Sequence, residues 1–127
     1  MHSDIRYLIQ VYAHATYIDA QSNPSENRYV FTYSVAIKNG GILPAQLLQR
    51  YWKITDGDGA IREVHGDGVV GEQPTIIPGD TFTYISGAIL DTVVGTMEGY
   101  FDMVAADGEV FRAIIPLFSL LKPSALH

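Results

Sequence analysis

Apolar and polar residues alternate with a period of two along most of this chain. The apolar face of the first such segment consists of Ile5, Tyr7, Ile9, Val11, Ala13 and Ala15. The next segment, Tyr29 to Lys38, alternates in the same way and is rich in β-branched and aromatic residues. Because such residues favour a pleated, half-buried surface, the pattern predicts strands rather than helices.

Five further strands are predicted downstream. The first of them places Leu48, Trp52 and Ile54 on one face, and we expect Arg50, on the same face, to lie near the strand end with its head group in water. The others are predicted over residues 60–65, 81–86, 97–103 and 109–115. Pro116 and the tail after it are expected to end regular structure, because proline cannot donate a ladder hydrogen bond.

Short turn sequences separate these segments. Asp56-Gly57-Asp58-Gly59 is typical of a hairpin turn, and Asn39-Gly40-Gly41 and Pro78-Gly79-Asp80 mark two other reversals. Seven short strands at this spacing predict an all-β fold, a seven-stranded antiparallel β-sandwich in two sheets of the immunoglobulin-like or fibronectin type III-like kind. The expected core aromatic residues are Trp52, Phe31, Phe82 and Phe101.

Length and composition set limits on the class of protein. With 127 residues, a single domain over 1–127 is expected, with an ordered core of about residues 5–120 and flexible termini. The chain has no cysteine, no apolar run long enough for a membrane and no signal-peptide pattern, so a cytoplasmic protein is predicted. Its net charge of −6 disfavours nucleic acid and is typical of a soluble monomer.

A G-x-G-x-x-G motif at Gly66, Gly68 and Gly71 suggests nucleotide binding. A dinucleotide site requires a helix that opens directly after the glycines, with free N–H groups aimed at the pyrophosphate. Pro74 and Pro78 follow too closely for a regular helix, and Glu72 stands where a P-loop carries lysine. The sequence therefore predicts a glycine-rich loop with positive φ angles and makes nucleotide binding an alternative only.

Several segments together resemble the ApaG family over roughly residues 7–120. They are Tyr29-Val30-Phe31-Thr32-Tyr33 with Asn39-Gly40-Gly41, Gln46 to Trp52 with Ile54-Thr55-Asp56, Gly66 to Pro74, Ser86-Gly87, Gly95 to Gly99, and Ile115 to Phe118. The resemblance implies a fibronectin type III-like sandwich. It also implies a protein-binding role, since related domains occur attached to F-box proteins and to a polymerase-interacting protein. Bacterial members are linked genetically to cobalt tolerance and magnesium efflux.

The chain departs from the family's usual residues at two positions. His65 stands where members commonly carry arginine, and Tyr51 stands where many carry histidine. The first change removes a cation that would favour an anion at the glycines. The second removes a potential metal ligand.

Other chemical candidates are few. Four histidines, His2, His14, His65 and His127, are scattered without metal-ligand spacing. Asp56 and Asp58 begin like a calcium loop, but Ala60 occupies the next ligand position. The serines lack a nucleophile-elbow context, and Asp67 and Glu72 are expected to cap loop N–H groups or face water. No catalytic residue, metal site or cofactor is predicted.

The sequence as a whole predicts a non-enzymatic binding domain whose partner is a protein. The candidate interaction loop comprises Gly66, Asp67, Gly68, Val69, Val70, Gly71, Glu72, Gln73 and Pro74. Val69 and Val70 either form part of this surface or tuck under the loop into the core. Two alternatives stay open: a small-anion module, for pyrophosphate or nucleotide, that uses these glycines, and a protein of divalent-metal binding or homeostasis. A strand left unpaired at a sheet edge is a second possible contact surface.

Overall fold

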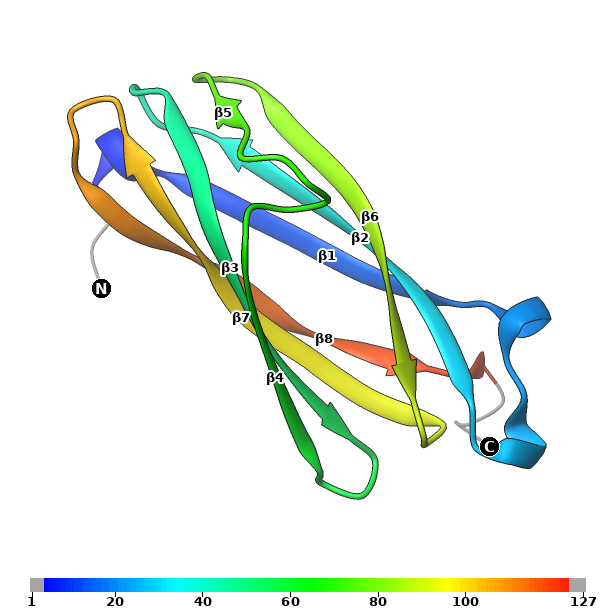
Figure 1. The fold of residues 1–127 in the computed structure, drawn as a ribbon. Helices are drawn as coiled ribbons and strands as arrows, with labels where there is room; N and C mark the ends of the chain where they lie inside the picture. Colours follow the sequence, from blue (N-terminus) through cyan, green and yellow to red (C-terminus); the bar gives the residue numbers. More distant parts are fainter. Residues whose placement is uncertain (1–3, 124–127) are drawn as a thin grey trace.

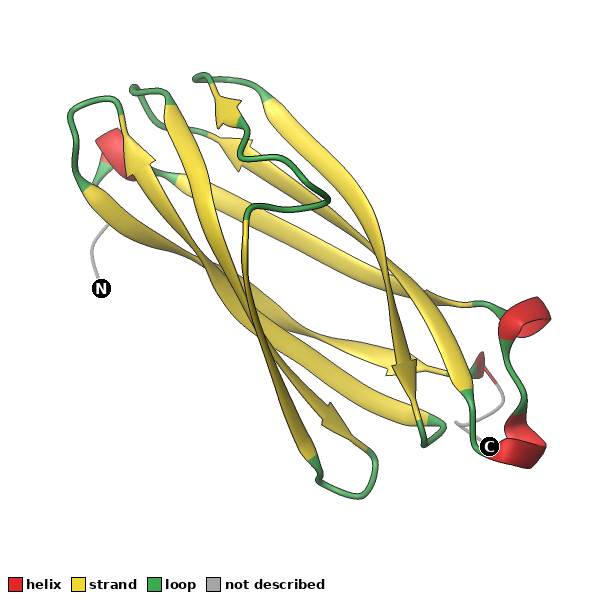
Figure 2. Cartoon of the chain, viewed as in Figure 1, coloured by secondary structure: helices red, strands yellow, loops and turns green. Residues whose placement is uncertain are grey.

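The computed structural model describes residues 4–123 as two antiparallel β-sheets packed face to face (Figure 1). The strands are β1 (Ile9–Tyr17), β2 (Tyr29–Asn39), β3 (Ala45–Asp56), β4 (Ile61–Asp67), β5 (Thr75–Ile76), β6 (Thr81–Leu90), β7 (Val94–Ala105) and β8 (Val110–Leu121). Three single-turn 3₁₀ helices that lie wholly within the described residues are outside the sheets: η1 (Ile5–Tyr7), η2 (Asp19–Gln21) and η3 (Pro24–Glu26) (Figure 2). None of the helices between residues 4 and 123 has the length and apolar character needed to cross a membrane.

The smaller sheet has the strand order β1-β2-β6, and the larger has the order β4-β3-β7-β8, with β5 paired to β3. All pairings are antiparallel. This arrangement confirms the predicted two-sheet sandwich, with the two-residue strand β5 in addition to the seven predicted strands. The flexible termini expected from the sequence, with His2, Ser124 and His127, lie outside the described residues.

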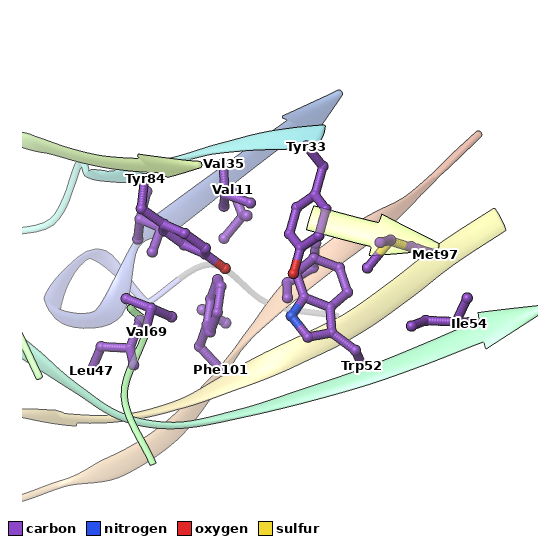
Figure 3. Close-up of a cluster of buried hydrophobic side chains, with 14 of the residues drawn as sticks. Val11, Tyr33, Val35, Leu47, Trp52, Ile54, Val69, Tyr84, Met97 and Phe101 are labelled. Carbon is purple, nitrogen blue, oxygen red and sulfur yellow. The ribbon is translucent and has the colours of Figure 1, made fainter. Parts of the chain in front are cut away.

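The core fills the space between the sheets (Figure 3). Trp52 on β3 lies at its centre, 2% exposed, and makes edge-to-face contacts with Tyr33 at 5.3 Å and Phe118 at 5.9 Å between ring centroids. Phe31 and Phe101 are fully buried, and Phe82 is half-buried against the same cluster. Burial of such large side chains supplies most of the stabilisation of a sandwich of this size.

The first strand begins later than the alternating pattern predicts. Ile5 to Tyr7 form a 3₁₀ turn instead of an extended segment, and β1 starts at Ile9. The turn forms because the Asp4 carboxylate accepts a hydrogen bond from the Arg6 backbone N–H at 3.0 Å, as an N-cap does. The alternation of residues 5 and 7 is therefore no sign of a strand.

A β-bulge in β3 changes which residues face the core. Pairing with β7 runs Leu47 to Met103 and then Gln49 to Asp102, so Leu48 is the extra residue. Leu47 is consequently buried completely, while Leu48 is only half-buried. The prediction that Leu48 shares the core face with Trp52 is wrong because the bulge shifts the alternation by one residue.

Pro116 does not end the last strand, contrary to the expectation from its sequence. Strand β8 continues to Leu121, and its pairing with β7 shifts between Met97, opposite Phe118, and Gly99, opposite Ile115. Pro116 and Leu117 thus lie at a bulge. A proline is tolerated there because a bulged residue needs no ladder hydrogen bond.

Candidate functional site

The glycine loop, defined as Gly66 to Pro74, connects the end of β4 to β5. Its centre is a two-residue turn in which Val69 and Glu72 exchange backbone hydrogen bonds, N–H to O, at 2.8 and 2.9 Å. The two central residues, Val70 and Gly71, have φ values of 43° and 82°. Positive φ at both positions is the requirement of a type I′ turn, which normally carries asparagine and glycine.

The two valines of this turn differ in burial: one of them tucks under the loop into the core, and the other lies at the surface. Val69 is fully buried and points into the core beside Tyr84 and Phe101 (Figure 3). Val70 is 56% exposed and holds the positive φ. A β-branched residue in this conformation is strained, by about 1 kcal/mol or more, because its Cβ approaches the backbone carbonyls.

Arg50 braces the start of the loop. Its guanidinium Nη1 donates hydrogen bonds to the carbonyl oxygens of Asp67 at 3.1 Å and Gly68 at 3.0 Å. Gly66 lies opposite Arg50 in the β3–β4 ladder, and a Cβ there would come within 2.6 Å of the Arg50 Cζ. The expectation that Arg50 sits near a strand end is wrong: it lies within β3 (Ala45–Asp56), and its half-exposed side chain crosses over Gly66 to hold the loop.

The bulge in β3 provides the second attachment. The carbonyl oxygen of Leu48 accepts hydrogen bonds from the Gly68 N–H at 2.8 Å and from the Gln73 side-chain amide at 2.9 Å. Gln46 in turn donates from its side chain to the Gln73 carbonyl at 3.1 Å. The loop is therefore fixed at both ends, with Val69 as an apolar anchor between them.

The loop lacks the local structure of a phosphate-binding loop. After Gly71 the chain forms a bridge residue, an irregular segment and the strand β5, with no α-helix anywhere in residues 4–123. The N–H groups of Gly68, Val69 and Glu72 are donated to carbonyl oxygens of the protein itself. The Arg50 guanidinium likewise donates to carbonyl oxygens of the loop. These donors are therefore satisfied within the protein and are not directed at an anion.

A cavity of about 310 Å³ adjoins the loop on the outer face of the larger sheet. Its lining residues are Gln49, Arg50, Tyr51, His65, Gly66, Asp67, Tyr100 and Asp102. Along one side stands a row of planar side chains contributed by neighbouring strands, His65, Tyr51, Tyr100 and Arg112. The Tyr51 ring centroid lies 4.8 Å from both His65 and Tyr100, and the Arg112 Cζ lies 4.0 Å above the Tyr100 ring.

Charged groups tie this aromatic row to the sheet. The Tyr51 hydroxyl donates a 2.6 Å hydrogen bond to Glu63, and this bond raises the pKa of Tyr51 to about 12. The phenol is neutral at physiological pH and is the donor in this bond. Arg112 forms an ion pair with Asp102 at 3.0 Å. The two positions at which the chain departs from the family pattern, Tyr51 and His65, are direct cross-strand partners, and their rings are in tilted contact.

The other acidic residues that the sequence offered as candidates take part in turn contacts or lie at the surface. Asp56 accepts hydrogen bonds from the backbone N–H groups of Asp58 and Ala60 at 2.9 and 3.0 Å, as expected for a hairpin turn. The Asp67 carboxylate accepts a bond from the Gln49 side chain at 3.3 Å, and Glu72 is exposed. Within residues 4–123 no three histidine, aspartate or glutamate side chains gather in an arrangement that could hold a metal ion.

The fold and the braced loop define an all-β sandwich domain with a structured surface turn. The model of the ApaG domain matches residues 19–105. Proteins named ApaG from Azoarcus sp. (strain BH72) and Azotobacter vinelandii are 53% and 54% identical, covering 95% and 98% of this chain and 95% and 99% of theirs. The chain belongs to the ApaG family. A crystal structure described as the putative ApaA protein from Bordetella pertussis has a TM-score of 0.90 and 45% identity, covering 92% of this chain and 95% of its own.

Proposed function

We propose that this chain is a non-enzymatic, cytoplasmic domain that binds another protein through the glycine loop. The observation that carries this proposal is Val70. An apolar, β-branched residue is held exposed at a position where asparagine would be unstrained. Strain of this kind persists where the surrounding structure enforces it, and it concentrates at functional sites.

The bracing of the loop supports the same conclusion. Arg50, Gln73 and the buried Val69 fix the loop before any partner arrives, so little conformational entropy is lost when a partner binds. Asp67 and Glu72 flank the exposed Val70 and are themselves exposed. Such a tip, apolar at its centre and acidic at its sides, suits a partner with an apolar pocket and a basic rim.

Reversal of the two loop charges tests the proposal. The double variant Asp67→Lys with Glu72→Lys is expected to weaken capture of the cellular partner roughly tenfold, because complementary charges at a rim become repulsive. The midpoint of thermal unfolding should change little, since both side chains are exposed. Partners are identified by cross-linking in cells, and capture is then measured with the purified partner.

The matched control reverses two exposed acidic residues in other turns, Asp58→Lys with Glu109→Lys. This variant carries the same change in net charge and should bind the partner as the native chain does. Equal weakening in both double variants would show a non-specific effect of charge and would contradict a binding surface at the glycine loop.

Val70→Asn separates stability from binding. Asparagine is preferred at the first central position of a type I′ turn, so the free energy of unfolding should rise by about 1 kcal/mol. Capture of the same purified partner should fall, because the apolar contact is lost. Urea unfolding measures the first effect and a binding titration the second. A variant that gains stability and binds normally would mean that Val70 takes no part in recognition.

A further inference from the structure

Apart from the two-residue strand β5, the two sheets have four edge strands, and three of them are protected against further pairing. The edge strand β4 carries charges at Arg62, Glu63 and Asp67. The edge strand β8 contains Pro116 and its bulge, and β1 lies against β8 across the sandwich. Charges, prolines, bulges and coverage are the devices by which proteins prevent unwanted strand pairing.

Strand β6, the fourth edge, has none of these devices. Its ten residues, Thr81–Leu90, contain no charged residue and no proline. It pairs with β2 on one side only. A long, uncharged edge strand presents a row of unpaired N–H and C=O groups to any extended chain that approaches it.

The hydrogen-bond pattern identifies which groups face outward. In β2, Asn39 exchanges backbone bonds with the chain next to β6, donating to the Asp80 carbonyl and accepting from the Gly79 N–H. Val30, an even-numbered residue, instead accepts a bond from the Ile18 N–H, on the side of β2 that faces β1. Because backbone groups alternate along a strand, the odd-numbered residues of β2 bond β6.

The β2–β6 register then assigns the free groups. Odd residues of β2 lie opposite even residues of β6, for example Tyr33 opposite Ser86. The outward backbone groups of β6 therefore belong to its odd residues, Thr81, Thr83, Ile85, Gly87 and Ile89. The Ile89 carbonyl accepts a bond from Arg62 at 3.4 Å. The free stretch thus runs from Thr81 to Gly87, with all four outward residues exposed.

The side chains beside this edge suit an added strand. Ile85, 66% exposed, borders a shallow cavity of about 560 Å³ on the outer face of the smaller sheet, formed also by Tyr12, Ala36 and Thr83. An added strand would place alternate side chains next to Ile85, where they would bury apolar surface that is now in water.

Charge decides which occupant the edge accepts. Asp80 precedes β6 and Asp91 follows it, and both are exposed. If two copies of the chain paired β6 with β6 in an antiparallel ladder, the outward odd residues would lie opposite odd residues. Asp80 of each copy would then lie one position away from the residue opposite Asp91 of the other. Like charges this close to each other across a strand pair repel, and each copy carries a net charge of −6. An extended segment with basic residues at both ends would instead be attracted to Asp80 and Asp91.

We propose that the free edge of β6 binds an extended segment of another protein as an added strand, with lysine or arginine of that segment beside Asp80 and Asp91. This inference rests on the proposed function as a protein-binding domain and adds the conformation and charge of the partner segment. Main-chain hydrogen bonds to Thr81, Thr83, Ile85 and Gly87 hold the segment, and the two aspartates select it.

The test uses the full chain and a synthetic peptide of alternating valine and threonine flanked by lysines. Hydrogen exchange of the four outward amides, measured by NMR, is expected to slow when the peptide is added. The even-numbered amides of β6, already bonded to β2, should be unaffected. A twin peptide flanked by glutamates should bind about tenfold more weakly because of repulsion at both ends.

A pair of substitutions at Thr83 tests the edge directly. Thr83→Pro removes an outward N–H without touching the β2 ladder and should abolish peptide binding. Thr83→Val retains that N–H and should bind as the native chain does. Circular dichroism and thermal unfolding check that both variants are folded, and the twin-peptide comparison on the native chain stands independently of them.

Three results would overturn the inference. They are unchanged exchange at the four amides with the lysine peptide, equal affinity for the two peptides, or protection of the same amides that rises with protein concentration alone, which would identify a second copy as the occupant. If the peptide fails while Asp67→Lys with Glu72→Lys still weakens partner capture, only this inference is lost. If the peptide binds and those loop variants have no effect, the glycine loop is the part that fails.

Discussion

Trp52→Ala is expected to lower the free energy of unfolding by about 4 kcal/mol, a large part of the total stability of a domain of this size. Trp52 is 2% exposed and fills the middle of the core, in edge-to-face contact with the rings of Tyr33, Phe101 and Phe118. Its truncation removes the apolar burial and leaves a cavity that the two sheets cannot close, because both are held by their own ladders.

Equilibrium unfolding in urea, followed by far-UV circular dichroism, measures this loss without relying on the tryptophan signal. Tyr51→Ala is the matched control, since Tyr51 is the adjacent residue of β3 and lies on the outer face in the aromatic row. A cost of about 1 kcal/mol is expected there. Similar costs for the two variants would contradict the assignment of faces along β3.

The alternation of apolar residues was sufficient to predict the sandwich because each sheet has one buried and one solvated face. That condition imposes a period of two on β2, for example, where Phe31, Tyr33, Val35 and Ile37 are all buried. The turn at Asp56 to Gly59 could be predicted equally well, because its aspartate and glycines determine the hairpin locally.

The bulges in β3 and β8 could not be predicted from the sequence in this way. Leu47 and Leu48 are identical in side chain, so nothing in their composition indicates which of them faces the core. The choice depends on the pairing of β3 with β7, more than fifty residues away along the chain. Pro116 misled for a related reason: the local rule against proline in strands holds only where the partner strand requires the missing N–H.

In the candidate site, too, locally determined features could be predicted from the sequence, whereas features that depend on strand pairing could not. Pro74 and Pro78 allowed the sequence to predict that no helix follows Gly71, and the structure has none there. The aromatic row at Tyr51, His65 and Tyr100 was missed because its members come from three strands and meet only through the register. Because side chains alternate along a strand, Tyr51 points to the face opposite that of its neighbour Trp52, which marks it as an outward aromatic residue. This outward position of Tyr51 is the one feature of the sequence that could have indicated the aromatic row.

Gly68→Ala is expected to destabilise the protein by about 3 kcal/mol and to disrupt the glycine loop. Gly68 has φ of 62°, which costs a non-glycine residue about 1 kcal/mol. An added Cβ would also collide with the carbonyl oxygen of Glu72, the group that accepts the Val69 N–H. The turn must therefore open, and part of the burial of Val69 is lost with it.

Gly71→Ala is the control that separates these two contributions. Gly71 has φ of 82°, but a Cβ there meets no atom within 4 Å, so only the conformational cost of about 1 kcal/mol applies. Urea unfolding gives both values, and hydrogen exchange of the Val69 amide reports whether the turn has opened. If the loop is the binding surface, Gly68→Ala should also weaken partner capture more than Gly71→Ala does. Equal stability of the two variants would mean that the turn can shift around the new methyl group, and the loop would then be less rigid than its bracing by Arg50 and Gln73 implies.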